Sequence, residues 1–295
     1  MGCEKCFEEK RPMTKLKIAV QKSDRIANDF LSLLSNCGLQ TSGAMKKLYC
    51  NFVDFPLEIY FVRGGDIPVL MQEQFDIAVL GMDSFLQYQM AEQTEIARKL
   101  GFSKCHLSFA GKNSGENWDI QQLQNATIAT SYTNILQDFL DKNNIKSNIV
   151  KMSGSVETSI ELGFADYIFD IVQTGSTLMQ QGLTELKSVL NLEAILIKNK
   201  DFSSEILDDL LMRIDAVLLG KQQKYLMFNL KKELVDNIKS VLPAANSPTI
   251  LNLIDSDYVA IHTLCEKNKI FEICKKLKEF GAEGIIVSDV NLMVK

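Results

Sequence analysis

Apolar residues follow two patterns along this chain, short continuous runs and repeats with helical spacing. The runs at residues 16–20 (LKIAV) and 75–80 (FDIAVL) are typical of strands that are buried on both faces. Between them, apolar residues spaced three and four apart predict a helix that Ser23 can cap and Gly38 can end. The chain therefore begins with a strand, a helix and a further strand of the same sheet.

The same alternation continues through the first two thirds of the chain. Further strands are predicted at residues 57–62, 127–131, 148–152, 167–172 and 194–197, and Pro68 marks the start of a short helix. Strands alternating with helices indicate α/β layers around a largely parallel sheet. We expect the turn-rich residues 111–118 (GKNSGENW) to be the crossing between two such layers.

The last seventy residues follow a different order. Strands are predicted at 225–229, 249–253, 258–264 and 284–290, and helices at 232–242 and 269–280. That order, βαββαβ, is typical of a ferredoxin-like unit that can fold as a separate module.

Composition and charge narrow the class of protein. With 295 residues, 46% apolar and 23% charged, the chain is long enough for two or three domains. A net charge of −5 disfavours a nucleic-acid partner, and no apolar run is long enough to predict a membrane span. The seven cysteines are an odd number without a framework spacing, so we expect a cytoplasmic protein.

The first twelve residues are polar and are interpreted as an N-terminal extension. Cys3 and Cys6 form a Cys-x-x-Cys pair, but one pair supplies only two of the ligands that a zinc site needs. A metal site here is therefore disfavoured.

The most informative motif lies where the strand at 167–172 ends. Asp170 is followed by Thr174, Gly175, Ser176 and Thr177 at a predicted helix start. Backbone N–H groups, a glycine and hydroxyls in this order are suited to binding phosphate, and a strand-end carboxylate can bind sugar hydroxyls or magnesium. A capped strand-to-helix turn without a ligand would have the same local pattern.

Other polar groups follow neighbouring strands. Glu157, in the segment GSVE, begins a helix one strand earlier, although a carboxylate there also compensates the helix dipole. Lys22 and Arg25 follow the first strand, where cations oppose the helix dipole and so favour an anionic ligand. His106 and His262 have no suitable partners for Ser-His-Asp hydrolysis or zinc binding.

These segments together resemble the long form of the ATP phosphoribosyltransferase family. QKSDRI, RGGDIPVL, FDIAVLGMD, IATSY, GSVE, LGFADYIFDIVQTGSTL, SPTI and GAEGIIVSDV occur in the family's order from about residue 16 to the end. The resemblance implies that N1 of ATP attacks C1 of phosphoribosyl pyrophosphate (PRPP), with loss of pyrophosphate, in the first step of histidine biosynthesis. It also implies Mg²⁺ as the cofactor and the absence of a protein nucleophile.

The resemblance implies roles for individual residues. Glu157 and Asp170 are the expected catalytic residues, with Asp170 also holding the metal. The other expected ligand-binding residues are, for PRPP, Thr174, Gly175, Ser176, Thr177 and Leu178; for ATP, Lys22, Arg25 and Asp83; and for histidine as feedback inhibitor, Thr249, Leu264, Gly284 and Ser288.

The fold that the resemblance implies is α/β, with a two-lobed catalytic part like a periplasmic binding protein and a C-terminal ferredoxin-like, ACT-like regulatory domain. The expected parts are an extension at 1–12, lobe I at 13–111 with a returning segment at 194–222, lobe II at 112–193, and the regulatory domain at 223–295. A homo-oligomer, dimer and hexamer, is expected.

Two other functions share parts of this pattern. A two-lobed anion or small-molecule binding protein would have the same fold without catalysis, and a regulatory protein could join a lobe pair to an amino-acid sensor. The absence of a predicted signal peptide disfavours the first, and the absence of a predicted DNA-reading helix-turn-helix disfavours a repressor.

Overall fold

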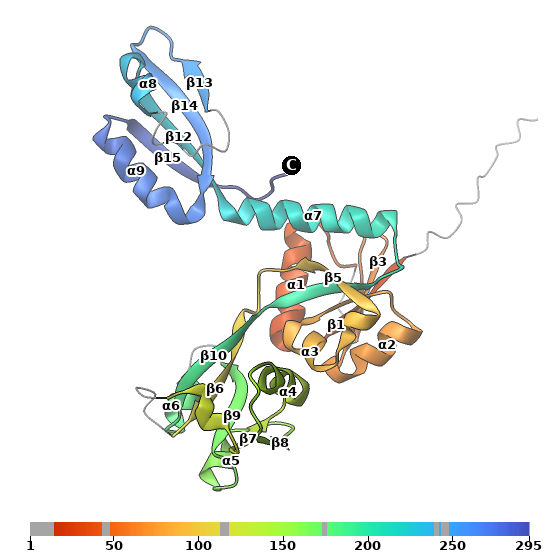
Figure 1. Ribbon diagram of the computed structural model, residues 1–295. Coiled ribbons are helices and arrows are strands. Elements are labelled where there is room, and N and C mark those ends of the chain that lie inside the picture. Colours follow the sequence, from red (N-terminus) through yellow and green to blue (C-terminus); the bar gives the residue numbers. More distant parts are fainter. Residues whose placement is uncertain are drawn as a thin grey trace, which may run out of the picture. The chain divides into compact units, whose positions relative to one another are not determined.

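The structure is a computed structural model that describes residues 15–42, 48–112, 118–172, 176–238, 242 and 248–294. The chain forms two compact units, Met1–Ser32 with Leu39–Ser204, and Leu33–Gly38 with Glu205–Lys295. Figure 1 shows the helices and strands of both units. The first unit contains two of the three sheets that the described residues form.

The first sheet has six strands in the order β2-β3-β1-β4-β11-β5. Strands β3, β1 and β4 are parallel, while β2, β11 and β5 each pair antiparallel with their neighbours. The strands are β1 (Leu16–Gln21), β2 (Tyr49–Asn51), β3 (Leu57–Val62), β4 (Ile77–Gly81), β5 (Thr94–Lys99) and β11 (Ala194–Asn199). The helices are α1 (Asp24–Asn36), α2 (Ile67–Glu73) and α3 (Met82–Gln87), with 3₁₀ turns at Gly64–Asp66 and Met90–Glu92.

The central strands of this sheet are buried on both faces. Ala19, Ala78 and Leu80 pack with residues of α2 and α3 in one hydrophobic cluster, while Ile18 and Val79, which point to the other face, are also fully buried. This burial explains why β1 and β4 are continuous apolar runs in the sequence.

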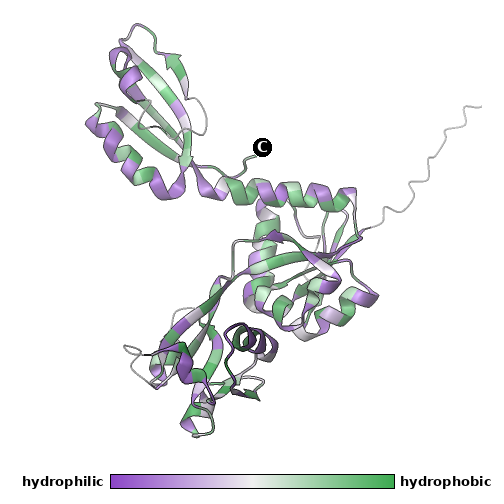
Figure 2. Ribbon diagram, viewed as in Figure 1, coloured by the Kyte–Doolittle hydropathy of each residue, from purple (hydrophilic) through white to green (hydrophobic). Residues whose placement is uncertain are grey.

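Figure 2 shows the hydrophobic colour along the strands and the hydrophilic colour over much of helix α9 (Ile270–Glu279).

The second sheet has five strands in the order β10-β6-β9-β7-β8. Its strands are β6 (Cys105–Gly111), β7 (Thr127–Thr130), β8 (Asn148–Lys151), β9 (Tyr167–Val172) and β10 (Thr184–Leu192). Its helices are α4 (Thr133–Lys142), α5 (Thr158–Glu161) and α6 (Ser176–Gln180), with a 3₁₀ turn at Ile120–Leu123. One hydrophobic cluster joins the sheet to α4, and another joins its opposite face to α5 and α6.

The chain crosses between these two sheets earlier than the turn signals predict. β5 belongs to the first sheet and β6 to the second, so the first crossing is at residues 100–104, not at 111–118. It returns at Glu193, between β10 and β11. The prediction of a crossing at 111–118 was wrong because β6 and β7, on either side of it, belong to the same sheet. A connection within one sheet has the same turn-forming residue types as a crossing between sheets.

The second unit contains a four-stranded antiparallel sheet in the order β13-β14-β12-β15. Its elements are α7 (Glu205–Gln222), β12 (Gln223–Lys231), a 3₁₀ turn at Lys232–Leu234, α8 (Val235–Ile238), β13 (Thr249–Asn252), β14 (Tyr258–Glu266), a 3₁₀ turn at Lys267–Lys269, α9, and β15 (Glu283–Asp289). From β12 onward, strands and helices follow the predicted βαββαβ order. α8 and α9 pack on one face of the sheet in a single hydrophobic cluster.

Two helices differ from their sequence predictions. The 18-residue helix α7 was not predicted, although Leu207, Leu210, Leu211 and Ile214 repeat with helical spacing and are buried. The helix predicted to begin near Ser155 is only the four-residue α5, because Ser155 adopts a left-handed conformation with φ 47°. Local polar turns decide such boundaries, and their conformation is not readable from apolar spacing.

Candidate active site

The ends of β1 and β4 approach each other closely. The side chain of Gln21 accepts a hydrogen bond from the backbone N–H of Gly81 at 3.0 Å. A Cβ atom added to Gly81 would lie 2.1 Å from Oδ1 of Asp83, so the Asp83 carboxylate would have to move away. Glycine at position 81 therefore lets the Asp83 carboxylate fold back over the end of β4.

Asp83 is a half-buried carboxylate in the first turn of α3. Burial raises its pKa, while the N–H groups of Asp83 and Ser84, the Ser84 hydroxyl and the guanidinium of Arg25 act in the opposite direction. The balance shows a carboxylate that is partly removed from water but lies beside a cation.

The two basic side chains that are predicted to bind the nucleotide have different surroundings. Lys22 is exposed, and its backbone N–H donates to the carbonyl of Val62 at 2.6 Å. Arg25 lies near Asp83 and hydrogen-bonds to the thiol of Cys105, at the start of β6. Arg25 thus connects the first sheet's layer to the second.

Asp170 is half-buried on β9, opposite Ser108 of β6. Its carboxylate accepts a hydrogen bond from the N–H of Ile171 at 2.7 Å. Burial raises the pKa of Asp170, the Ile171 hydrogen bond lowers it, and the negative charge of Glu157 raises it further. Glu157 precedes α5 and accepts a hydrogen bond from Gln181 at 3.2 Å. The structure therefore brings the two predicted catalytic carboxylates close enough to repel each other.

Tyr132 joins these groups and was not assigned a role from the sequence. It immediately precedes α4, and its hydroxyl hydrogen-bonds to Asp83. Its pKa is raised, first by burial and then by the negative charges of Asp83 and Asp170. Its position after a strand, in the segment IATSY, is the sequence signal that could have found it. Tyr132 thus lies near a carboxylate from each sheet.

The predicted phosphate segment is only partly described. Thr174 and Gly175 lie outside the described residues, and Ser176 and Thr177 begin α6 with side chains that are also outside the described part. Leu178 is buried in the cluster that joins α5 and α6 to the second sheet. The Leu178 side chain therefore packs in the core, and only its backbone could contact a ligand.

Two surface pockets lie elsewhere on the first unit. Their volumes are about 230 Å³ and 610 Å³, and both are lined by Met71, Gln72 and Gln93. The larger one includes Asp76, just before β4 begins, whereas Asp83 follows its end. Neither pocket is lined by a predicted site residue.

Among the described residues, the helices α8 and α9 cover one face of the third sheet and leave the other face uncovered. Leu264 and Ser288 lie opposite Tyr225 in the strand register, and Thr249 lies opposite His262. Opposite residues share a face, so three of the four predicted histidine-binding residues lie together. The fourth, Gly284, has a left-handed φ of 59° near the β15 bulge.

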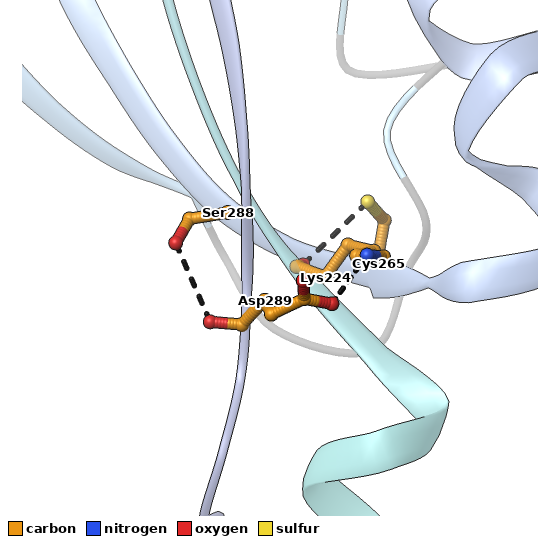
Figure 3. Close-up of polar contacts among 4 residues, drawn as sticks. All are labelled: Lys224, Cys265, Ser288 and Asp289. Atoms are coloured by element: carbon orange, nitrogen blue, oxygen red, sulfur yellow. Dashed lines mark hydrogen bonds and ion pairs between the residues drawn. The ribbon is translucent and has the colours of Figure 1, made fainter.

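Tyr225 and His262 form the polar centre of this face, and sequence reasoning assigned neither a role. The Tyr225 hydroxyl and Nδ1 of His262 are 2.8 Å apart, and their rings meet edge to face. Figure 3 shows the contacts at the neighbouring end of β15. The Lys224 side chain forms an ion pair with Asp289, and the Lys224 backbone carbonyl accepts a hydrogen bond from the Cys265 thiol. The Ser288 hydroxyl donates to the Asp289 backbone carbonyl. These contacts fix β15 against β12 beside Ser288.

Comparisons with known proteins agree with this geometry. The family model described as "HisG: ATP phosphoribosyltransferase" matches residues 63–216. ATP phosphoribosyltransferases from Cytophaga hutchinsonii and Bacteroides fragilis are each 38% identical to this chain, over 96% and 95% of it respectively and 99% of their own length.

The chain belongs to the ATP phosphoribosyltransferase family. It is therefore a pentosyl-transferring enzyme of the first step of histidine biosynthesis, as its sequence predicts. The model described as "HisG, C-terminal domain" matches residues 220–292, which include the third sheet.

The predicted fold class of this ATP phosphoribosyltransferase is also confirmed. A solved structure, the ATP phosphoribosyl transferase (HisG:HisZ) complex from Thermotoga maritima, has a similar fold with a TM-score of 0.57 and 22% identity. The similarity covers 68% of this chain and 96% of that one.

Enzymes of this family use a metal ion, so we tested whether the described residues suit one. They contain no group of three or more His, Cys, Asp or Glu side chains that could hold a metal. Asp170 and Glu157 are two mutually repelling carboxylates, and a cation near them would relieve that repulsion. Such a site suits a hard cation that takes its other ligands from substrate and water.

In the described part of the chain, no helix is long and apolar enough to cross a membrane.

Proposed function

We propose that Asp170, Glu157, Tyr132, Asp83 and Arg25 form the site in which this enzyme joins ATP to the phosphoribosyl group of PRPP. The observation that carries the proposal is the hydrogen bond from the Tyr132 hydroxyl to Asp83, together with the charge effects of Arg25 on Asp83, of Asp170 on Tyr132 and of Glu157 on Asp170. These groups come from both sheets of the first unit. They can therefore hold two substrates face to face, which is the main task when the nucleophile belongs to a substrate.

On the PRPP side, Asp170 and Glu157 are proposed to accept hydrogen bonds from the ribose hydroxyls. The segment Thr174–Leu178 keeps its predicted role in binding the 5-phosphate through backbone N–H groups and hydroxyls. Bond formation between N1 of ATP and C1 of the ribose accompanies release of pyrophosphate. No described side chain needs to form a covalent bond.

On the ATP side, the cations Lys22 and Arg25 are proposed to contact the nucleotide phosphates. Asp83 lies beside Arg25 and can orient its guanidinium, since a paired cation has fewer accessible positions. Tyr132 lies near Asp83 and Asp170, where it can separate the nucleotide from the ribose.

We propose Mg²⁺ as the metal, held by Asp170 with Glu157 nearby. When bound, Mg²⁺ supplies positive charge that stabilises the departing pyrophosphate. The chain's own part is to hold the two carboxylates in position, through the Ile171 hydrogen bond to Asp170 and the Gln181 hydrogen bond to Glu157.

We propose that histidine inhibits the enzyme by binding the uncovered face of the third sheet, near Thr249, Leu264, Gly284 and Ser288. Tyr225 and His262 add aromatic and hydrogen-bonding groups to this surface. Inhibition from there must act by changing the relative stability of two arrangements of the protein. The dimer and hexamer, the cytoplasmic location and the domain boundaries at 13, 194 and 223 remain predictions, the assembly being testable by light scattering.

The deciding experiment measures phosphoribosyl-ATP and pyrophosphate by chromatography after mixing the enzyme with ATP, PRPP and Mg²⁺. We expect both products in equal amounts, with formation suppressed by histidine. Binding of PRPP without any product would instead support the binding protein that shares this fold.

A further inference from the structure

Helix α4 begins without a cap from its own sequence. Tyr132 occupies the N-cap position with φ −111° and ψ 56°, and its side chain makes no capping hydrogen bond. The first N–H groups of a helix have no partner within the helix, so another group must accept them. The acceptor here comes from the layer of the first sheet.

Gln87, the last residue of α3, provides this acceptor. Its Oε1 accepts from the backbone N–H of Asn134 at 3.1 Å, and its Nε2 donates to the Thr133 hydroxyl at 3.2 Å. Its backbone carbonyl accepts from the Asn134 side chain at 2.7 Å. One residue thus makes three hydrogen bonds to the first turn of a helix in the other sheet's layer.

The same two helices carry the contact between Asp83 and Tyr132. Asp83 and Gln87 are four residues apart on α3, so they lie on the same side of that helix, one turn from each other. Tyr132 directly precedes Thr133. The capping contact and the contact in the proposed active site are therefore adjacent, one turn apart on the same pair of elements.

Tyr132 is held from its own side as well. Its backbone N–H donates to the hydroxyl of Thr130 at 2.8 Å, and this fully buried hydroxyl donates to the carbonyl of Phe169 at 2.6 Å. The backbone of Tyr132 is thereby fixed to the second sheet. The position of Tyr132 relative to Asp83 then depends on where α3, which carries Asp83, lies relative to the second sheet.

We infer that Gln87 is a positioning residue, which caps α4 from the neighbouring layer and so holds Asp83 against the Tyr132 hydroxyl on the nucleotide side of the site. The inference rests on the proposed function, because the nucleotide side is defined there. Gln87 acts through Asp83 and Tyr132, with no contact to a reacting atom required.

The test replaces Gln87 by alanine and compares KM for ATP, KM for PRPP, kcat and the melting temperature. We expect KM for ATP to rise about fivefold, the size of one or two lost hydrogen bonds, with kcat and KM for PRPP changed less than twofold. Gln137→Ala is the matched control. Gln137 lies on α4, and its side chain donates within that helix, to Asp141 at 2.8 Å, so the KM values of Gln137→Ala should stay at the wild-type level.

A double-mutant cycle separates positioning from a general structural effect. In a Tyr132→Phe background the hydroxyl that Gln87 aligns is absent, so adding Gln87→Ala should no longer change KM for ATP. Thr133→Ala removes one of the three contacts from the other side and should raise KM for ATP in the same direction. This second variant also serves if Gln87→Ala folds poorly.

Two results would overturn the inference in an enzyme whose wild type is active. One is a Gln87→Ala variant with the KM for ATP of Gln137→Ala, and the other is an unchanged effect of Gln87→Ala in the Tyr132→Phe background. A wild-type enzyme that makes no phosphoribosyl-ATP would contradict the proposed function itself. The two failures are therefore distinguishable.

Discussion

At the scale of single residues, Asp170 combines burial with a negative charge that its proposed role needs. Burial and the nearby Glu157 raise its pKa, so the folded protein holds the Asp170 proton more tightly than the unfolded chain does. Below the ordinary pKa both states are protonated and no penalty exists. Between the ordinary and the raised pKa the unfolded chain ionises while the folded protein does not, so stability falls as the pH rises, and the full loss is present above the raised pKa.

Asp170→Asn should therefore stabilise the protein while it inactivates the enzyme. Near neutral pH we expect a higher melting temperature than that of the wild type, and the difference should shrink as the pH falls towards the ordinary range of aspartate pKa values. Activity should fall by about 100-fold or more, as for loss of a charged group at a reaction centre. Calorimetry across pH and product assays check this, and a variant that is both less stable and fully active would contradict it.

The absence of a side chain at Gly81 leaves space for the neighbouring Asp83 carboxylate. A Cβ atom at this position would lie 2.1 Å from Oδ1 of Asp83, so Gly81→Ala should displace that carboxylate from Arg25 and Tyr132. The backbone itself, at φ −70° and ψ 142°, accepts alanine. We expect a rise of about tenfold in KM for ATP, the size of losing one charged hydrogen bond.

The control for Gly81→Ala is the same substitution in an Asp83→Ala background. The clashing carboxylate is absent there, so the added methyl group should have no further effect on KM for ATP. An equal effect in both backgrounds would show that Asp83 is not the group displaced.

At the scale of elements, α1 shows a cap that the sequence predicts and the structure confirms. The Ser23 hydroxyl accepts from the N–H of Ile26 at 3.1 Å, and Gly38 ends the helix region with φ 80°. Both features are local, since they depend on the residue type and the next turn of chain. They need no information about the rest of the fold.

Ser23→Ala should lower the free energy of unfolding by about 1 kcal/mol, because one N–H of the first turn loses its acceptor. Ser23→Asp keeps an acceptor and should restore most of that stability. Chemical denaturation of the three proteins provides the comparison. Equal stability of Ser23→Ala and the wild type would mean that water replaces this cap without loss.

At the scale of the whole molecule, the proposed histidine site can be tested by removing the third sheet while retaining α7. A cut after Gln222 keeps the helix with which Leu33–Gly38 forms one compact unit. It removes the contact between Ala216 and Met293 and the close approach of Val290 to Gly220. We expect phosphoribosyl transfer to persist and inhibition by histidine to disappear.

A point variant covers the possibility that this truncation does not fold. Tyr225→Ala removes the hydrogen bond to His262 on the uncovered face without touching the hydrophobic cluster on the other face. The concentration of histidine needed for half inhibition should rise by about tenfold, as for loss of an aromatic contact and a hydrogen bond. Normal inhibition in both proteins would place histidine elsewhere.

The sequence indicated most of the elements that depend on local patterns. Strands at 57–62 and 167–172 were predicted with their observed ends, because fully or alternately apolar runs between turn residues are unambiguous. Helix α7 was missed, although its spacing was readable. The crossing at 100–104 was also missed, because no residue type there distinguishes a change of sheet from an ordinary loop.

The candidate site divides in the same way. Asp170, Glu157, Arg25 and Asp83 could be named in advance because each lies at or just after the end of a strand in a recognisable motif. Gln87 could not, since it gains its proposed role from contacts with residues more than 40 positions away. Tyr132 follows a strand in IATSY, a signal that went unused, but its contact with Asp83 is equally distant along the chain. Those contacts depend on which helix faces which.

By itself, the sequence determined the family, the α/β class, the order of strands and helices from β12 onward, and the residue types available for phosphate and sugar. These features follow from the local spacing of residues and from motifs that can be recognised in one sequence. The tertiary structure alone decided that Asp83 and Tyr132 meet, that Gln87 caps α4, and that three predicted histidine-binding residues share one sheet face. The physical reason is that hydrogen bonds, burial and electrostatic repulsion depend on distance in space, which packing sets independently of distance along the chain.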